Sequence, residues 1–169
     1  HLTTRRQRQM CIRDSMTAAE VDQRMALLSG TTEYEELKDA DVIIEAIYEN
    51  IDVKVEAFQK MEAVAKPGAI LASNTSGLDI DKMAAATSRP DAVIGLHFFS
   101  PANVMKLLEV VRGKDTSNET IASSMKLGKT LNKIAVLSGN APGSSVTACW
   151  RATPVRQAKL SCKVPPHTK

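Results

Sequence analysis

The sequence predicts an α/β protein built on a doubly wound, mostly parallel sheet. Short β-branched runs alternate with segments of helical periodicity through most of its 169 residues, which favours parallel strands joined by helices. A hydrophobic content of 43% and a charged content of 24% are typical of a globular domain with its own core. No apolar run approaches the roughly 20 residues that a membrane-spanning helix needs.

The first predicted element is a helix in the segment TAAEVDQRMALLSG, residues 17–30. Val21, Met25 and Leu28 stand at helical spacing and predict one apolar face. Gly30 stands at a C-cap position, where glycine commonly ends a helix. We therefore expect an amphipathic helix that ends near this glycine.

A buried strand and a long helix are predicted next. DVIIEAIY (41–48) is a short run rich in β-branched residues, which indicates a strand covered on both faces. Asn50 is a suitable cap for the helix that follows, and Pro67 with Gly68 closes that helix. The apolar face of this helix is expected to consist of Ile51, Val55, Phe58, Met61 and Ala65.

Four further strands and two helices complete the pattern. The strands are predicted at AILASN (69–74), AVIGLHFF (92–99), KLLEVVRG (106–113) and IAVLSG (134–139). A short helix over 79–87 has acidic residues in its first turn, where the helix dipole favours negative charge. Thr116 and Glu119 have the spacing of a capping box for a helix over 117–130.

The composition divides the chain into three zones. Residues 16–143 contain 13 basic and 18 acidic residues, a net charge of −5, whereas the two ends together carry +8. Because the basic balance belongs to the ends alone, it does not support nucleic-acid binding. The three cysteines also lie in the ends, and their spacing indicates neither a zinc site nor a disulfide framework. We expect residues 1–15 to be non-native or disordered and residues 144–169 to be a disordered tail.

Polar clusters follow three of the predicted strands. They are YEN after the first strand, SNTSG after the second and FFSPAN after the third. In doubly wound sheets ligands bind at the carboxyl ends of the strands, so these positions suit a ligand crevice. Ordinary polar loop starts would give the same pattern. The sequence has no G-x-G-x-x-G, the turn with which a dinucleotide-binding domain usually opens.

His97 and Glu109 are the candidate proton-transfer pair. If 92–99 and 106–113 are neighbouring strands, a turn between them brings the imidazole and the carboxylate side by side. A buried carboxylate fixes the tautomer of a histidine and stabilises its imidazolium, which makes a competent general base. The alternative from spacing alone is a core histidine with an unrelated glutamate on the neighbouring strand.

Three stretches carry a resemblance to a known family. VIIEAIYENIDVK, ILASNTSGLDI and GLHFFSPANVMKLLEVVRG resemble the NAD-binding domain of the L-3-hydroxyacyl-CoA dehydrogenases, and most of all the dehydrogenase part of multifunctional fatty-acid β-oxidation proteins. The resemblance covers residues 16–143. It implies a partial NAD-binding domain with an incomplete Rossmann-like sheet that lacks its first strands. It also implies an oxidoreductase of lipid metabolism that oxidises (S)-3-hydroxyacyl-CoA to 3-oxoacyl-CoA with NAD.

The resemblance assigns catalytic and cofactor-contacting roles to single residues. His97 matches the catalytic base, Glu109 its partner, and Ser76 the serine that contacts the 3-oxygen of the substrate near the nicotinamide. The positions that match cofactor-binding residues are Ala46, Glu49, Lys54, Ser76 and Ser100. Many relatives have asparagine at the last of these, and serine is common in the multifunctional branch.

The sequence departs from the family at both ends. The family's first strand, its glycine-rich turn and an acidic residue for the ribose should precede residue 16, where HLTTRRQRQMCIRDS stands instead. After APG the family continues with phenylalanine and a run ending in Asn-Arg, but here SSVTACWRA follows and Thr147 replaces the asparagine. One back-translation of this stretch, read with one extra base in front, encodes Phe-Ile-Gly-Asn-Arg-Val-Leu-Ala. We therefore expect a frameshift near codon 144.

These departures from the family should affect NAD binding, turnover and association. Without the cofactor turn and the helical C-terminal domain of the family, the chain as written should bind NAD weakly or not at all and turn over no substrate. Without the first strands, the sheet has an unpaired edge and should tend to associate. The intact parent should be dimeric or part of a multifunctional chain, and cytoplasmic in a bacterium or peroxisomal rather than secreted. The expected partner is an acyl-CoA substrate. Two alternatives stay open: a non-catalytic dinucleotide-fold binding or structural protein, and a dehydrogenase of small 3-hydroxy acids, whose relatives use lysine.

Overall fold

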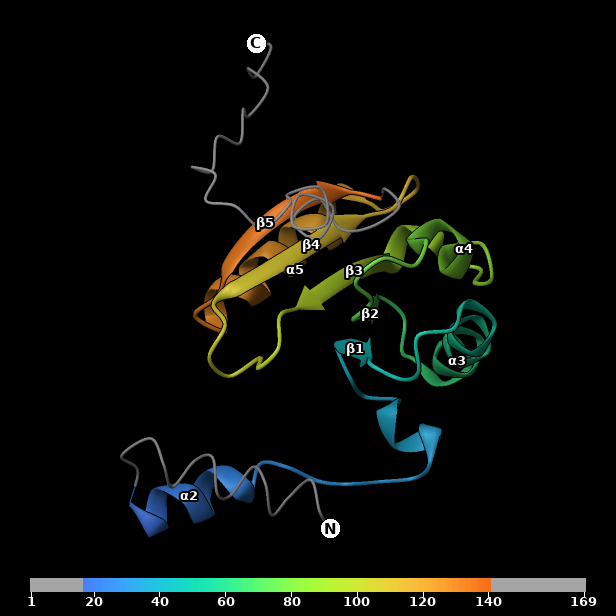
Figure 1. Cartoon of the computed structure of the whole chain (residues 1–169). Coiled ribbons are helices and arrows are strands. Elements are labelled where there is room, and N and C mark those ends of the chain that lie inside the picture. Colours follow the sequence, from blue (N-terminus) through green and yellow to red (C-terminus); the bar gives the residue numbers. More distant parts are fainter. Residues whose placement is uncertain (1–16, 141–169) are drawn as a thin grey trace, which may run out of the picture. The chain divides into compact units, whose positions relative to one another are not determined.

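The computed structural model describes residues 17–140, and Figure 1 traces their helices and strands. The chain divides into two compact units, His1–Glu36 and Leu37–Lys169. The predicted ends, residues 1–15 and 144–169, lie outside the described residues.

The first described helix is α2 (Ala18–Met25). It begins with a capping box in which Thr17 and Glu20 exchange hydrogen bonds, and the Thr17 backbone N–H is the main cause that lowers the pKa of the Glu20 carboxyl. The prediction of its end is wrong, because the helix stops at Met25 with Ala26 as its C-cap rather than continuing to Gly30. Of the expected apolar face, Val21 is buried but Leu28 is exposed.

The second unit contains one five-stranded sheet. Its strands are β1 (Val42–Glu45), β2 (Ile70–Ser73), β3 (Val93–Phe98), β4 (Leu107–Arg112) and β5 (Ile134–Gly139), which lie side by side in that order. The pairs β1–β2, β2–β3 and β4–β5 are parallel, whereas β3 and β4 are antiparallel. The α/β class and the mostly parallel sheet are therefore confirmed, and each strand lies within its predicted segment.

Helices cover both faces of this sheet, as a doubly wound fold requires. α3 (Ile51–Val64) and α4 (Ile80–Ala84) pack on one face in a cluster with residues such as Leu71 and Val93. α5 (Asn118–Thr130) lies along β4 and β5 (Figure 1), where Ile121 and Met125 pack against the cluster on the other face. Two short 3₁₀ helices, η1 (Tyr34–Leu37) and η2 (Pro90–Ala92), complete the elements.

The long helix α3 follows its prediction except at one position. The side chain of Asn50 accepts from the backbone N–H groups of Asp52 and Val53, so the predicted cap is confirmed. Phe58 and Met61 are buried as expected. Lys54, which no apolar pattern includes, is also completely buried. An alkylammonium enters a protein interior only with partners for its charge, which are described below.

The predicted cap of α5 is wrong by one residue. Ser117, not Thr116, accepts from the backbone N–H of Thr120. The Thr116 hydroxyl instead donates to the carbonyl of Val93 and accepts from the backbone N–H of Gly113. Thr116 therefore holds the end of β4 against β3 and is not available to the helix.

The pairing of β3 with β4 requires a small residue at position 95. A Cβ on Gly95 would lie 2.8 Å from Cβ of Val111 and 3.1 Å from Cδ1 of Ile80. Glycine at this position therefore allows α4 to pack closely on β3 and β4.

Among residues 17–140, no helix has the length and apolar character to cross a bilayer.

Candidate active site

His97 and Glu109 lie directly opposite each other in the antiparallel pair β3–β4. Their side chains meet with 2.8 Å between His97 Nδ1 and Glu109 Oε2. Phe99 packs beside the imidazole, with 4.4 Å between the ring centroids. The juxtaposition predicted from the two strands is therefore confirmed.

The geometry of this pair suits proton transfer. The carboxylate accepts a hydrogen bond but has no hydrogen to donate, so the proton of a neutral imidazole lies on Nδ1 and Nε2 keeps its lone pair. The side chain of Glu109 is 1% exposed and that of His97 is 11% exposed. The carboxylate is thus shielded from water, while a small part of the imidazole side chain stays accessible.

The loop between β3 and β4 is held by Lys133, which lies between α5 and β5. Lys133 donates from Nζ to the backbone carbonyls of Ala102 and Met105, the latter at 2.7 Å. Ser100 is exposed in this loop, and its peptide bond to Pro101 is cis. Ser100 is three residues after His97 and lies just beyond the carboxyl end of β3.

The polar segment after β2 is anchored to both neighbouring strands. The Asn74 side chain accepts from the backbone N–H of Phe98 at 2.8 Å, which ties this segment to the end of β3. Ser76 is exposed, and its hydroxyl makes no hydrogen bond with another described residue. A small pocket opens beside it, lined by Thr75, Ser76, Gly77, Leu78, Ile80, Val111 and Asn140.

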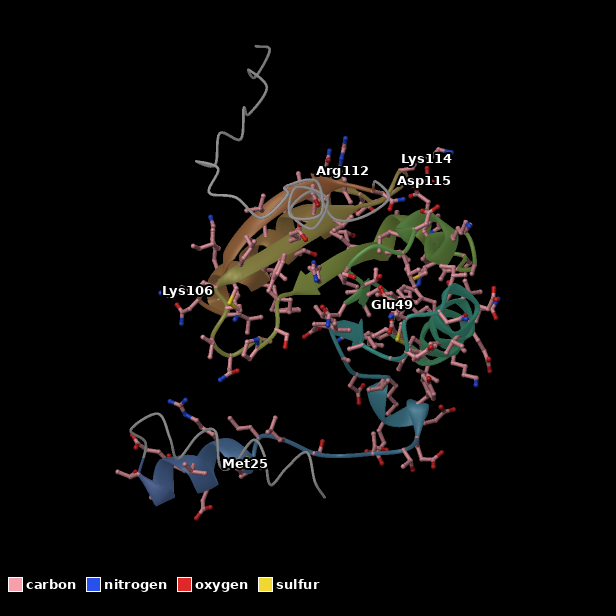
Figure 2. All side chains as sticks on the ribbon, viewed as in Figure 1. Met25, Glu49, Lys106, Arg112, Lys114 and Asp115 are labelled. Atoms are coloured by element: carbon pink, nitrogen blue, oxygen red, sulfur yellow. The ribbon has the colours of Figure 1, made fainter. Side chains whose placement is uncertain are left out.

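A buried charged cluster joins β1, α3 and the segment after β2. Lys54 Nζ lies 2.6 Å from Glu45 Oε1 and 3.3 Å from Glu49 Oε2. Glu45 also accepts from the Ser73 hydroxyl at 2.6 Å. Glu49 accepts from the Thr75 hydroxyl at 2.5 Å and lies in the loop between β1 and α3 (Figure 2).

The sheet places this cluster and the His97–Glu109 pair on one face. Glu45, Ser73 and Gly95 are register partners across β1, β2 and β3. His97 is two residues beyond Gly95, and side chains two residues apart in a strand share a face. The charged cluster and the imidazole therefore border the same edge, at the carboxyl ends of three parallel strands, where ligands of such sheets bind.

A comparison of the sequence with models of protein families identifies a family for this chain. A family model described as the NAD-binding domain of 3-hydroxyacyl-CoA dehydrogenase matches residues 2–141. The chain belongs to this family. The resemblance seen in the three sequence stretches is therefore confirmed.

Relatives of the dehydrogenase domain occur in long and short proteins. The peroxisomal bifunctional enzyme of Danio rerio is 48% identical over 123 residues, which are 73% of this chain and 17% of that protein. The 3-hydroxybutyryl-CoA dehydrogenase of Clostridioides difficile is 44% identical over 127 residues, 75% of this chain and 44% of that enzyme. The chain thus spans less than half the length of these curated relatives.

A solved structure has the same fold. The (S)-3-hydroxybutyryl-CoA dehydrogenase of Ralstonia eutropha superimposes with a TM-score of 0.80 at 39% identity. The match covers 84% of this chain and 50% of that one. The described residues therefore have the architecture of a dehydrogenase domain, and the Rossmann-like class is confirmed.

The dehydrogenase fold brings most of the predicted site residues to one edge of the sheet, but in different environments. Ala46, Glu49, Ser76 and Ser100 are exposed at the carboxyl ends of β1, β2 and β3. Lys54 is fully buried instead. Thr147, predicted to replace the substrate asparagine, lies outside the described residues.

Sequence reasoning missed two members of the charged cluster, Glu45 and Ser73. Both are strand residues with polar side chains in otherwise apolar runs, and this pattern could have singled them out, although not their partner. The described residues contain no group of three or more histidine, cysteine or acidic side chains arranged to hold a metal ion.

Proposed function

We propose that this chain supplies the NAD-binding domain and the proton-transfer pair of a dehydrogenase that oxidises (S)-3-hydroxyacyl-CoA to 3-oxoacyl-CoA in fatty-acid β-oxidation. The observation that carries the proposal is the 2.8 Å contact between His97 and Glu109 at the carboxyl end of β3. A non-catalytic binding protein of the same fold would have no need of this pair. The names of the relatives support the substrate class.

The residues present fit a nicotinamide dinucleotide. Glu49 is anchored by Thr75, by the Ser76 backbone N–H and by Lys54, and its side chain is still 45% exposed. A carboxylate has about four acceptor positions, so Glu49 retains one for a hydroxyl or amide of the cofactor. Ala46, Ser76 and Ser100 are the other exposed positions proposed for the cofactor, at the carboxyl ends of β1, β2 and β3. When bound, the nicotinamide supplies the hydride acceptor for C3 of the substrate.

The chain's own residues handle the proton. Nε2 of His97 removes the proton of the substrate hydroxyl while C3 loses its hydride, so that the C–O bond becomes a carbonyl. Glu109 stabilises the resulting imidazolium through Nδ1. The hydroxyl of Ser76 donates to the substrate's 3-oxygen. Lys54, whose Nζ lies 3.3 Å from Glu49 Oε2, belongs to the same proposed cofactor-binding group.

Partners and location follow from the relatives and belong to the same proposal. The substrate is an acyl-CoA, and the domain works as part of a larger protein, either a multifunctional chain or a dimeric dehydrogenase. A peroxisomal or bacterial cytoplasmic location agrees with the named relatives in Danio rerio and Clostridioides difficile.

A segment exchange tests the proposed reaction. The matched segment of the Clostridioides difficile enzyme is replaced by residues 17–140 of this chain, and NADH oxidation with acetoacetyl-CoA is measured. The chimera should turn over, and His97→Gln or Glu109→Gln in it should lower kcat by about 10²- to 10⁴-fold. Glu119→Gln, an exposed glutamate of α5, is the matched control and should leave kcat unchanged.

Two results would contradict the proposal. One is a folded chimera without turnover, and the other is turnover that is indifferent to His97→Gln. The prediction that the chain as written turns over no substrate is tested by the same assay on the unmodified 169-residue chain.

A further inference from the structure

Asn74 joins the ends of three neighbouring strands. It follows β2 directly, and its backbone N–H donates to the carbonyl of Glu45 at the end of β1 at 2.7 Å. Its side-chain Oδ1 accepts from the backbone N–H of Phe98, the last residue of β3, at 2.8 Å. One residue therefore connects the end of β3 to the segment after β2.

The side chain of Asn74 stands beyond the point where the ladder between β2 and β3 stops. Their last register pair is Ser73 with Gly95, three residues before Phe98. On its other edge β3 stays paired with β4 as far as Phe98, which lies opposite Leu108. Among the described residues, the end of β3 therefore has a strand on one edge only. On the other edge Asn74 supplies the acceptor that the backbone N–H of Phe98 needs.

The segment that carries Ser76 is a compact turn that begins after Asn74. The hydroxyl of Thr75 accepts from the backbone N–H groups of Gly77 at 3.2 Å and Leu78 at 3.0 Å. These hydrogen bonds close the turn around Ser76, so the position of Ser76 depends on the residue from which the turn begins. The contact of Asn74 with β3 therefore also determines where the Ser76 hydroxyl lies relative to that strand.

The proposed reaction needs His97 and Ser76 to reach one atom. His97 removes the proton of the substrate hydroxyl, and Ser76 donates to the same oxygen. Glu109 holds the imidazole from β4, on the side of β3 that faces away from the Ser76 segment. This hold does not set the distance between the two reacting groups. A misplacement of about 1 Å between such groups can lower the rate by about 10²-fold.

We propose that Asn74 is a positioning residue: by holding the backbone N–H of Phe98, it sets the separation between the Ser76 hydroxyl and the His97 imidazole. Its role rests on the proposed reaction, in which both groups act on the 3-oxygen of the substrate. Asn74 acts through these two residues and not on the substrate itself.

The first test is spectroscopic and uses the full chain without cofactor. Asn74→Leu removes the acceptor at nearly constant size, so the ¹⁵N order parameter of the Phe98 amide should fall. Hydrogen exchange of this amide should accelerate about tenfold, as expected for the loss of one hydrogen bond. Asn74→Asp keeps an acceptor oxygen in the same place and should preserve both values.

Thr116→Val is the matched control for this test. It removes a hydroxyl that donates to the Val93 carbonyl at 2.7 Å, at the other end of β3, and should leave the Phe98 amide unchanged. A folded Asn74→Leu variant whose Phe98 amide is as rigid and as protected as in the wild type overturns the inference.

The second test measures turnover in the chimera with the Clostridioides difficile enzyme. Asn74→Leu should lower kcat by about 10- to 10²-fold with little change in the KM for NADH, because the contact serves the reacting groups. Asn74→Asp should retain most of the turnover, and Thr116→Val should leave kcat unchanged.

A double-mutant cycle separates positioning from support of the fold. In Ser76→Ala the group whose distance from His97 is set by Asn74 is absent, so adding Asn74→Leu should lower kcat much less than it does alone. Equal factors with and without the Ser76 hydroxyl would overturn the inference. A folded chimera without turnover would contradict the proposed function, while the Phe98 amide would still decide whether Asn74 fixes the end of β3.

Discussion

His97 and Lys54 both have a buried glutamate as partner, yet the two pairs differ in access to solvent. The imidazole keeps an exposed edge, whereas the ammonium of Lys54 is fully enclosed. A group that exchanges protons with a substrate must be reachable, and a group that holds other residues in place is better fixed when water is excluded. The two pairs on this sheet face therefore differ in solvent access, which is partial for the imidazole and absent for the ammonium.

Removing one member of the Lys54–Glu45 pair should cost more stability than removing both. Lys54→Met leaves an uncompensated buried carboxylate, and we expect a loss of about 3–5 kcal/mol in the free energy of unfolding. Adding Glu45→Gln removes that charge; the amide oxygen can still accept from the Ile47 N–H, and the amide NH₂ can donate to the Ser73 hydroxyl, so most of the loss should be recovered. Urea unfolding of the wild type and both variants measures this. A double variant no more stable than Lys54→Met would refute the explanation.

The two pairs also differ in how far the sequence predicts them. His97 and Glu109 could be paired from sequence because both lie in neighbouring strands joined by a short turn. The burial of Lys54 could not, because lysine normally extends to solvent and its partner Glu45 stands inside an apolar run. Lys54 and Glu45 meet because α3 packs against β1 and β2, and only the structure shows this packing.

The short helix α4 depends on a side chain from the end of β5. Asp79 caps α4, and the Asn140 amide donates to Asp79 Oδ1 at 2.6 Å. This contact is the main cause that lowers the pKa of the Asp79 carboxyl from its ordinary value of 3.8. A folded-state pKa below the unfolded one stabilises the protein above the unfolded value, and this contribution is lost as the pH falls through the folded value.

The Asp79 contact predicts a pH-dependent difference between two proteins. Asp79→Asn keeps a capping side chain but removes the charge. Near neutral pH the wild type should be the more stable, by less than about 1 kcal/mol because the site is exposed, and the difference should shrink as the pH falls below the ordinary pKa of the carboxyl. Urea unfolding across this range measures it, with Asp115→Asn in the loop after β4 (Figure 2) as the matched control. A difference that stays constant with pH would exclude the Asn140 contact as its cause.

The approach of α4 to β3 and β4 should be sensitive to one methyl group. In Gly95→Ala the new Cβ would lie 2.8 Å from Cβ of Val111, so we expect a loss of about 1–3 kcal/mol in the free energy of unfolding. Gly139→Ala is the matched control, because nothing lies within 4 Å of its Cβ position. Thermal and urea unfolding measure both. Equal stability of the two variants would mean that the sheet adapts to the added group.

The elements differ in how well their ends follow from sequence. The five strands were predictable because β-branched runs bounded by polar and small residues leave few alternatives. The end of α2 and the cap of α5 were not. Gly30 lies five residues beyond the actual end of α2, and Thr116 is engaged by β3 and β4. Caps depend on which competing partner a side chain finds, which spacing alone does not reveal.

At the scale of the molecule, the last strand of the described sheet has apolar side chains in contact with water. Ile134 is 62% exposed, Leu137 46% and Val136 42%. Among the described residues β5 pairs only with β4, so its second edge offers free backbone groups beside these side chains. Exposed apolar edge strands promote association.

Placing a charge on this strand should reduce self-association. Ile134→Lys introduces the residue that natural edge strands often use against edge-to-edge pairing. We expect sedimentation velocity at rising concentration to show less association than for the wild type. Thr130→Lys adds the same charge at the end of α5 and is the control. An unchanged distribution of species for Ile134→Lys would exclude this edge as the contact.

The antiparallel β3–β4 pair also has a consequence for the order of assembly. His97 and Glu109 are separated by only 12 positions, so closing one short loop brings them together. Hairpins form within about 1–10 μs, whereas contacts across a parallel crossover must wait for a longer segment to close. Glu45 and Ser73, 28 positions apart, meet only after α3 has crossed between β1 and β2. The His97–Glu109 pair should therefore form before the contact between Glu45 and Ser73, and should persist longest when the sheet opens from its β1 side.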